Sequence, residues 1–446
     1  MSNTKSSAKI IGVSAYGTTL AAAAGRISTT NGTALQIFEK SVDNPNNAKL
    51  IKAVLSSGHR STMEHCFFNM AFNNVSAFVE QYIIEFRLAS FTVQSRRYVD
   101  FSKVGFFSAM EEGEAKTLYE NHVRELFATY ERLLSLDIPK EDARFVLPYC
   151  FHSNFYCSAN ARELLHMIAT MIYGRGSVFT EIKALGKELA AQFEEYFPGE
   201  LARQEKAYVK EANASANWLA AHTGKKAAEP TVAAASTTLL THSALSTEAL
   251  LDAATCNFAT LPEDADLYSG RKRELELVSL TYRISDLTLS AITHLVRHRI
   301  QSVLVPLVGT ALYQNHYVMP ASVKACPEAE AIYTAAFEKN RQVFNTLVDM
   351  GIDASYSVYL VLSGNTMDLI SSMNGREFVH YCALRTCNRA QWEIREVAIS
   401  MLRQARAVLP HVFHKVGPGC YMNGVCPEGS KTCGEAIAVK KFFSEL

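Results

Sequence analysis

The strongest constraint on the fold of this chain is that its sequence contains the same pattern twice. Asn-Ala-Arg-Glu-Leu-Leu-His at 160–166 returns 214 residues later as Asn-Gly-Arg-Glu-Phe-Val-His at 374–380. Two further matches keep the same order at a spacing of 212 residues: Arg-x-x-Ser at 87–90 and 299–302, and Glu-Ile at 181–182 and 393–394. Matches in one order at nearly one spacing indicate an internal duplication, so we expect two copies of one fold.

The duplication predicts the division of the chain. At 446 residues the chain is also too long for a single compact core. A segment rich in Ala, Lys and Glu between the copies is typical of a helical linker. We therefore expect four parts: a first repeat at 1–196, the linker at 197–230, a second repeat at 231–416 and a Cys/Gly-rich tail at 417–446.

Each copy mixes strand and helix patterns. Residues 67–72 and 275–282 alternate in polarity as strands do, whereas 114–134 and 378–409 have long helical patterns. The polar start is followed by Ile-Ile-Gly-Val at 10–13, which favours a first strand over a signal peptide. The second copy should open likewise, with strands near Thr231 and Thr238. The pattern predicts an α+β fold, an antiparallel sheet packed with long helices.

Composition excludes several classes of protein. The chain has 44 basic and 44 acidic residues, so no general affinity for nucleic acid is expected and any anion site must be local. No apolar run reaches the roughly 18 residues that a membrane-spanning helix needs. Ten cysteines without a secretory signal indicate reduced thiols and a cytoplasmic location.

The stretch 293–302 carries the densest charge next to an apolar pattern. If it continues a helix, His294, Arg297 and His298 share one face and Arg299 turns away. This much cationic and imidazole character beside a buried stripe calls for an anionic ligand. The alternative is a solvated basic face.

Ser-Arg-Arg-Tyr at 95–98 is a candidate phosphate-binding segment. If extended, it places Ser95 and Arg97 on one face, where a hydroxyl and a guanidinium can bind a phosphate. The alternative is an edge strand protected by charge.

Two segments of the first copy predict helix starts. Ser61 and Glu64 have the spacing of a capping box, and Asn160 is a good N-cap. Beyond that cap, Arg162 and His166 share one helix face.

The glycine-rich C-terminal tail predicts a metal site with low specificity. Glycine turns allow thiolates to converge on one zinc ion or iron–sulfur cluster. The spacings are looser than in paired Cys-x-x-Cys motifs, so free thiols are the alternative. The candidate ligands are Cys387, Cys420, Cys426 and Cys433.

These motifs resemble those of flavin-dependent thymidylate synthases. Arg-His-Arg-x-x-Ser at 297–302 is similar to the core of that family's signature. The family's other motifs are matched by Gly-His…Glu-His at 58–65, Ser-x-Arg-Tyr at 95–98, Arg-x-x-Leu-Pro at 144–148, the two Asn-x-Arg segments, and Ala-Gln-Trp-Glu-Ile-Arg at 390–395. The resemblance covers nearly the whole chain, as two tandem copies of the family's fold.

The resemblance implies the roles of individual residues. Arg297 and Arg385 would be catalytic, holding the pyrimidine and offsetting charge on its carbonyls. The other substrate-binding residues would be Ser95, Arg96, Arg97, Tyr98, Arg144 and His294. The FAD-binding residues would be His65, His298, Arg299, Ser302, Asn374, Arg376 and His380, with Asn160, Arg162 and His166 either joining them or surviving as remnants.

The two copies depart from the family pattern in complementary ways. The first has Glu85 and Phe86 where the second has Arg297 and His298, yet it keeps the phosphate-binding motifs. The second keeps the signature but has an apolar run at 303–307 in place of Ser-x-Arg-Tyr. We expect one composite site per chain, the repeats packing as a pseudo-dimer and two chains forming a homodimeric pseudo-tetramer.

The activity implied by the resemblance is FAD-dependent methylation of dUMP to dTMP. Methylenetetrahydrofolate would be the carbon donor and NADPH the reductant. Two alternatives remain: a related flavoenzyme acting on another uracil-containing substrate, and a non-catalytic nucleotide-binding or scaffold protein.

Overall fold

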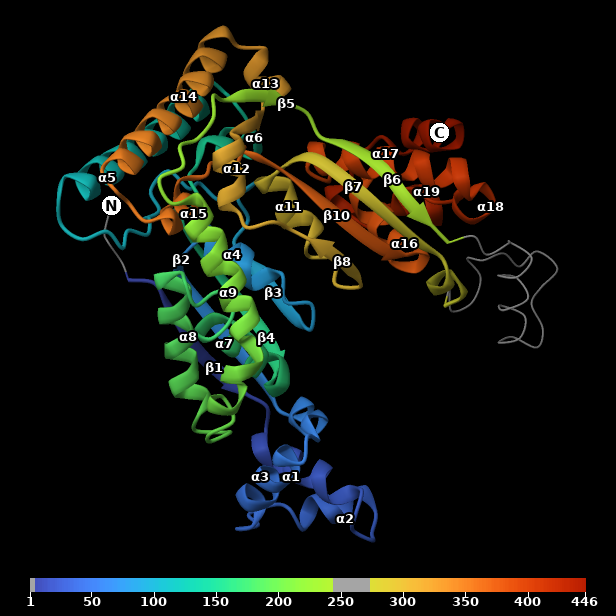
Figure 1. The fold of residues 1–446 in the computed structure, drawn as a ribbon. Helices are drawn as coiled ribbons and strands as arrows, with labels where there is room; N and C mark the ends of the chain where they lie inside the picture. The colour runs from blue at the N-terminus through green and yellow to red at the C-terminus, as the bar shows by residue number, and fades with distance from the viewer. Residues whose placement is uncertain (1–4, 244–272) are drawn as a thin grey trace. The chain divides into compact units, whose positions relative to one another are not determined.

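The computed structural model describes residues 5–243 and 273–446, which form two compact units (Figure 1). Each unit is built from three stretches of the chain. Unit 1 contains Met1–Ser135, Leu147–Lys226 and Gln342–Val361, and unit 2 contains Leu136–Val146, Ala227–Arg341 and Leu362–Leu446.

Unit 1 is organised around a four-stranded antiparallel sheet of order β1-β2-β4-β3. Its strands are β1 (Ser7–Val13), β2 (Phe67–Ser76), β4 (His152–Asn160) and β3 (Ala89–Val93). Burial alternates along β2, where Phe68, Met70 and Phe72 face the core. The expected first strand at 10–13 is confirmed.

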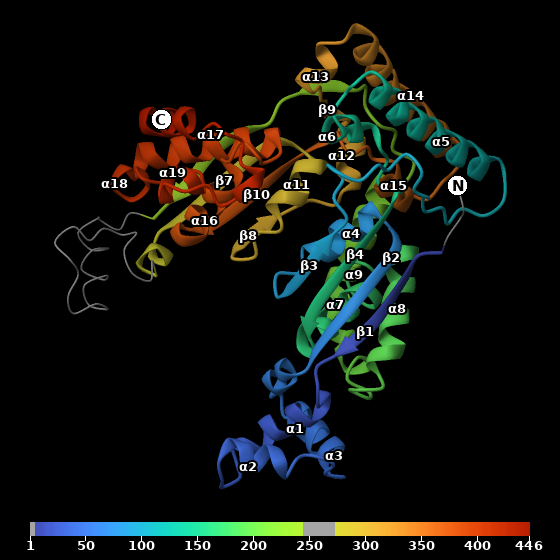
Figure 2. The ribbon, with the colours of Figure 1, turned by 180° about the vertical axis from the view of Figure 1, so that it is seen from behind.

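Helices cover one face of this sheet. In Figure 1 they lie in front of the strands, and Figure 2 turns the opposite face of the sheet to the viewer. The helices are α7 (Ala161–Ile172) and α8 (Thr180–Phe193), with α9 (Glu205–His222) packed against α7. No residue of α9 is buried, so little packing stabilises this helix. Its Ala, Lys and Glu residues favour the helix through their high intrinsic helix propensity. This helix lies within the predicted linker.

The rest of unit 1 consists of connecting helices. The helices between β1 and β2 pack on one another as a small cluster. They are α1 (Gly17–Ile27), α2 (Ala34–Glu39), α3 (Asn47–Ser56) and the 3-10 helix η1 (Arg60–His65). The unit is completed by α4 (Ala77–Ile84), α5 (Glu114–Ser135), η3 (Ala202–Gln204), η5 (Ala354–Tyr356) and α15 (Ser357–Leu360).

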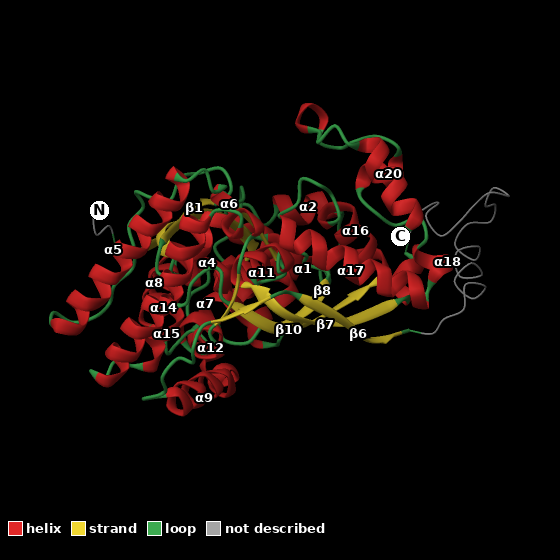
Figure 3. Cartoon of the chain, turned by 90° about the horizontal axis from the view of Figure 1, so that it is seen from above, coloured by secondary structure: helices red, strands yellow, loops and turns green. Residues whose placement is uncertain are grey.

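Unit 2 repeats the same sheet, of order β6-β7-β10-β8. Figure 3 shows α16 and α17 lying along one face of it. The strands are β6 (Ser236–His242), β7 (Ser279–Thr288), β10 (Thr366–Asn374) and β8 (Gln301–Leu304), and the helices are α16 (Gly375–Arg385) and α17 (Trp392–Val408). The matching strand orders confirm the α+β class and the tandem duplication.

The remaining elements of unit 2 include a short parallel pair of strands, β5 (Thr231–Ala233) and β9 (His316–Val318). The others are α6 (Lys140–Ala143), η2 (Arg144–Val146), η4 (Glu274–Leu277), α11 (Leu289–Leu295), α12 (Gly309–Gln314), α13 (Ala321–Lys324), α18 (Pro410–Phe413), α19 (Gly419–Asn423), η6 (Gly429–Lys431) and α20 (Ala436–Glu445). Helix α14 (Pro327–Asp349) contributes residues to both units.

Three expected elements differ in detail. Leu275–Leu277 form part of η4, so the predicted strand at 275–282 begins only at Ser279. The helical pattern at 378–409 is broken after Arg385 and resumes at Trp392, where Gln391 caps α17. The predicted capping box at Ser61 is absent from η1, because the carboxylate of Glu64 pairs with Arg162 instead.

The compact units do not follow the repeat boundaries, because each takes a corresponding segment from the other repeat. Leu136–Val146 belongs to repeat one but lies in unit 2, and Gln342–Val361 belongs to repeat two but lies in unit 1. Backbone hydrogen bonds hold both segments: Tyr149 N–H donates to Val361 O (2.9 Å), and Gly364 N–H donates to Phe145 O (2.8 Å). Each unit therefore contains residues from both repeats.

Within the described parts of the chain, no helix combines the length and the apolar character needed to span a membrane.

Candidate functional site

The helices α4 and α11 begin in the same way in the two units. Ser76 and Thr288 are their N-caps, and each is held by a buried glutamate, Glu181 of α8 for Ser76 and Glu393 of α17 for Thr288. The backbone N–H of Ser76 donates to Glu181 Oε1, and that of Thr288 donates to Glu393 Oε1, both at 2.9 Å. Burial raises the pKa of both carboxyl groups to about 7.

Helix α11 ends before the signature residues. Its last residue is Leu295, and His298 N–H donates to Leu295 O (3.0 Å) in the turn that follows. Arg297 and Arg299 are exposed, whereas His298 is only 4% exposed. The expectation that His294, Arg297 and His298 share one helix face is therefore wrong, because the helix does not continue through them.

His298 joins two side chains of α16. Arg385 donates its Nε–H to His298 Nε2 at 3.0 Å, and His298 Nδ1 lies 3.1 Å from Glu377 Oε1. Burial lowers the pKa of His298, opposed by Glu377 and assisted by the charge of Arg385. The ring is therefore neutral inside a hydrogen-bonded chain.

The exposed side of α16 adds further cationic and imidazole groups. Asn374 caps the helix by accepting the N–H of Glu377 (2.8 Å). Arg376 and His380, four residues apart, are exposed, and the His380 ring lies 5.7 Å from that of His298. Ser302 is exposed on β8, opposite a residue of β10. Unit 2 thus holds all the predicted residues of the repeat-two motifs.

Arg144 joins this unit from repeat one. It is 3% exposed, its Nε–H donates to Glu141 O (3.0 Å), and its charge counteracts the raised pKa of Glu393. The neighbouring Asp142 accepts a hydrogen bond from Trp392 Nε1 at 2.8 Å. Asp142 and Arg144 of repeat one therefore contact the Ala-Gln-Trp-Glu motif of repeat two.

In unit 1 the equivalent of the signature lines a pocket of about 650 Å³. Glu85 there pairs with Arg175 (2.7 Å), whose guanidinium lies 5.8 Å from the centre of the Phe86 ring. The predicted residues Asn160, Arg162 and His166 also line this pocket. Arg162 pairs with Glu64, and His166 Nδ1 is hydrogen-bonded to the hydroxyl of Tyr208 from α9 (2.7 Å). In this pocket, Arg162, His166 and Glu85 therefore each have a partner side chain within unit 1. His65, another predicted residue, is exposed in η1.

The segment 95–98 is a turn rather than the extended strand considered above. Ser95 Oγ accepts the backbone N–H of Arg97 (3.3 Å), and Tyr98 N–H donates to Ser95 O. Arg96 is buried and paired with Glu80 at 2.8 Å, so it stabilises the turn from within the unit. Tyr98 is 75% exposed, and Arg97 lies over its ring at 5.9 Å.

The predicted metal site at Cys387, Cys420, Cys426 and Cys433 is not supported. Where the structure describes the chain, no three His, Cys, Asp or Glu side chains are arranged to hold a metal ion. Cys387 Sγ instead accepts the N–H of Arg389 (3.4 Å), and Arg389 donates to the carbonyls of residues 431 and 432. The hydrogen bonds of Arg389 join the tail to the segment that follows α16.

Some residues of these sites were not singled out from the sequence. Glu377 contacts His298 of the signature, Arg175 pairs with Glu85 of its copy, and Asp142 accepts a hydrogen bond from Trp392. Glu377 had a detectable signal, since it occupies the third helical position after Asn374 as Glu163 does after Asn160. In the sequence, helix capping by Asn374 is enough to account for a glutamate at this position. Its contact with His298 is visible only in the structure.

Comparison with known proteins finds one family twice in this chain. The family model described as "Thymidylate synthase complementing protein" matches twice, at residues 10–199 and 220–411. A flavin-dependent thymidylate synthase of Geobacter sulfurreducens is 33% identical over 221 residues, covering 49% of this chain and 95% of the relative. This chain belongs to the flavin-dependent thymidylate synthase family.

Other relatives match a shorter part of the chain. A flavin-dependent thymidylate synthase of Nitratidesulfovibrio vulgaris is 35% identical over 180 residues, covering 38% of this chain and 73% of its own. A solved structure, a UMP/dUMP methylase PolB from Streptomyces cacaoi bound with 5-Br dUMP, matches with a TM-score of 0.37 and 21% identity, covering 47% of this chain and 97% of its own. The family model and the named relatives identify this flavin-dependent thymidylate synthase homologue as an enzyme of the methyltransferase type in which the family sequence occurs twice.

Proposed function

We propose that this protein methylates dUMP to dTMP with FAD, using methylenetetrahydrofolate as carbon donor and NADPH as reductant. The observation that carries the proposal is the arrangement in unit 2. There the turn at 297–299 and the end of α16, far apart in sequence, are joined through His298 and Arg385. These are the residues to which the family motifs assign the pyrimidine and the flavin.

The chemistry of unit 2 fits a flavin nucleotide. The diphosphate of FAD is anionic, and the exposed guanidinium of Arg299 can bind it through charge-assisted hydrogen bonds. Arg376 is exposed too but pairs with Glu276 at 2.6 Å, so it would have to share or exchange this partner to bind the diphosphate. His298, His380, Asn374 and Ser302 would supply the remaining polar contacts. Reduced flavin would supply the hydride to the activated pyrimidine.

The protein's own contribution is binding, orientation and charge. Arg297 and Arg385 would bind the pyrimidine carbonyls, with His294 as a further nucleotide contact, and offset the negative charge that develops on these carbonyls. Ser95, Arg97 and Arg144 would bind the phosphate of the nucleotide. The turn geometry supports the role of Ser95 and Arg97, because it fixes their backbone relative to one another.

The copy of the signature in unit 1 should not hold a second flavin. An acidic residue, Glu85, stands where a cation would face phosphate, and Arg175 is engaged with it at the pocket wall. We therefore propose one flavin site per chain, assembled from motifs of both repeats. The repeats would act as a pseudo-dimer, and two chains would form a pseudo-tetramer.

The other candidate function is methylation of a different uracil-containing substrate. The observation that favours it is the loss of Ser-x-Arg-Tyr from repeat two, where 303–307 is apolar. A different phosphate environment would change the choice of nucleotide.

Spectroscopy and isotope exchange test the proposal. Purified protein should carry a flavin absorption spectrum and titrate to one FAD per chain. Ring-deuterated dUMP should then release its label in the presence of methylenetetrahydrofolate and NADPH. A colourless protein that takes up no FAD would contradict the proposal. Two flavins per chain would contradict the single site. Label release only from another uracil nucleotide would favour the second candidate function.

A further inference from the structure

Arg385, His298 and Glu377 form a chain of hydrogen bonds with a defined direction. Arg385 can only donate, so His298 Nε2, 3.0 Å from its Nε, must be an acceptor without a proton. The proton of the neutral ring then lies on Nδ1, which is 3.1 Å from Glu377 Oε1. The carboxylate accepts this proton's hydrogen bond and so determines which nitrogen of His298 faces Arg385.

The surroundings keep this chain in place. His298 is 4% exposed and meets the Tyr381 ring edge-on at 5.0 Å. The backbone of Glu377 is held by Asn374, whose side chain accepts its N–H at 2.8 Å. A protonated His298 would present a second donor to Arg385, so the chain requires the neutral ring that burial favours.

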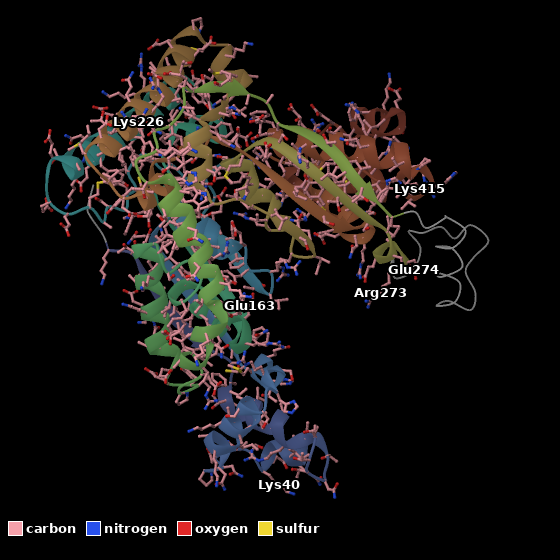
Figure 4. All side chains as sticks on the ribbon, in the orientation of Figure 1. Lys40, Glu163, Lys226, Arg273, Glu274 and Lys415 are labelled. Atoms are coloured by element: carbon pink, nitrogen blue, oxygen red, sulfur yellow. The ribbon has the colours of Figure 1, made fainter. Side chains whose placement is uncertain are left out.

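The first repeat provides an internal comparison. Glu163, labelled in Figure 4, occupies the same position on α7, and its N–H donates to Asn160 Oδ1 at 2.9 Å. The residue equivalent to His298 there is Phe86, which has no ring nitrogen. The glutamate thus has a capping position in both repeats, but only in repeat two does it contact a histidine that bonds an arginine.

We propose that Glu377 is a positioning residue that acts through His298 on Arg385. By holding the Nδ1–H tautomer of His298, it fixes the orientation in which the guanidinium of Arg385 meets its ligand. The identity of that ligand as the pyrimidine of dUMP rests on the proposed function; the hydrogen-bonded chain itself does not.

Three variants test this inference in the flavin-loaded protein. Glu377→Leu removes the acceptor, Glu377→Gln keeps an amide oxygen that can accept from Nδ1–H, and Glu163→Leu removes the equivalent glutamate where no histidine is present. The readouts are the Kd of dUMP by calorimetry and the nitrogen-15 spectrum of labelled histidine, with the His298 signals assigned through His298→Phe.

Glu377→Leu should weaken dUMP binding by about 10- to 100-fold, as expected for a misplaced charged hydrogen bond, and should remove the Nδ1–H signature of His298. Glu377→Gln should stay within about threefold of the wild type. Glu163→Leu should leave dUMP binding unchanged, although it loses a carboxylate at the same position of its helix.

Two results would overturn the inference. One is a folded Glu377→Leu protein with unchanged dUMP affinity and an unchanged His298 tautomer. The other is an equal loss of affinity in Glu163→Leu, which would assign the effect to helix capping. If the wild type binds no dUMP, the proposed function fails, while the spectrum of the ligand-free protein still decides whether Glu377 sets the tautomer.

Discussion

Replacing the buried Glu393 with glutamine should stabilise the protein at neutral and alkaline pH. Its carboxyl group is completely buried, and burial raises its pKa from 4.5 to about 7 despite the hydrogen bonds from Thr288. In the unfolded chain the same group titrates near 4.5. Between these values the folded state binds more protons than the unfolded state, so the free energy of unfolding falls as pH rises from 4.5 to about 7.

The magnitude follows from the size of this difference. At about 1.36 kcal/mol for each pKa unit, ionising buried Glu393 costs about 3 kcal/mol above pH 7 and nothing below pH 4.5. The neutral amide of Glu393→Gln avoids this cost and can still accept the Thr288 N–H. We therefore expect a gain approaching 3 kcal/mol at about pH 8 that vanishes below about pH 4.5.

The chain offers a local probe for this measurement. Its two tryptophans are Trp218 and Trp392, and Trp392 adjoins Glu393. Urea unfolding in a Trp218→Phe background, followed by fluorescence at several pH values, reports on the unit that contains Glu393. The exposed Glu131→Gln is the control and should show no such trend. A loss of stability in Glu393→Gln at about pH 8, or a gain that does not depend on pH, would refute the reasoning.

Two further predictions concern the signature and the helix that supports it. Arg297→Ala and Arg97→Ala should each abolish dUMP turnover, measured by label release. Arg87→Ala should leave turnover largely intact, because repeat one has lost the rest of the signature. Equal loss of turnover in all three variants would contradict the division of roles between the repeats. Gly375→Ala should destabilise the protein by about 1–3 kcal/mol in urea unfolding. The added Cβ would lie 2.7 Å from the carbonyl oxygen of Leu275, so an unchanged midpoint would show that this close approach relaxes without cost.

The repeated fold was predictable because its signals are local. The spacing of repeated motifs led directly to two copies of an α+β fold, and both sheets have the same strand order. The side chains of Asn160 and Asn374 cap α7 and α16 as their positions in the sequence indicate. Capping depends on residues three positions apart, which the sequence displays without ambiguity.

The sequence names candidate site residues but does not give their conformation. The motif residues of repeat two do gather in unit 2, yet the helix expected to carry Arg297 and His298 on one face ends at Leu295. His298 turns inward because its partners, Glu377 and Arg385, come from a helix about 80 residues later. Periodicity within one segment contains no information on such partners.

By itself, the sequence determined that this protein is a duplicated member of its family, and it named the candidate side chains of the site. Only the tertiary structure decided which segments each unit contains, since Leu136–Val146 and Gln342–Val361 are each built into the unit formed mainly by the other repeat. It also revealed the contacts of His298 with Arg385 and Glu377, and it showed no metal-binding arrangement of the tail cysteines among the described residues. The physical reason is that hydrogen-bond direction, burial and thiol geometry depend on groups brought together by folding, not on their order along the chain.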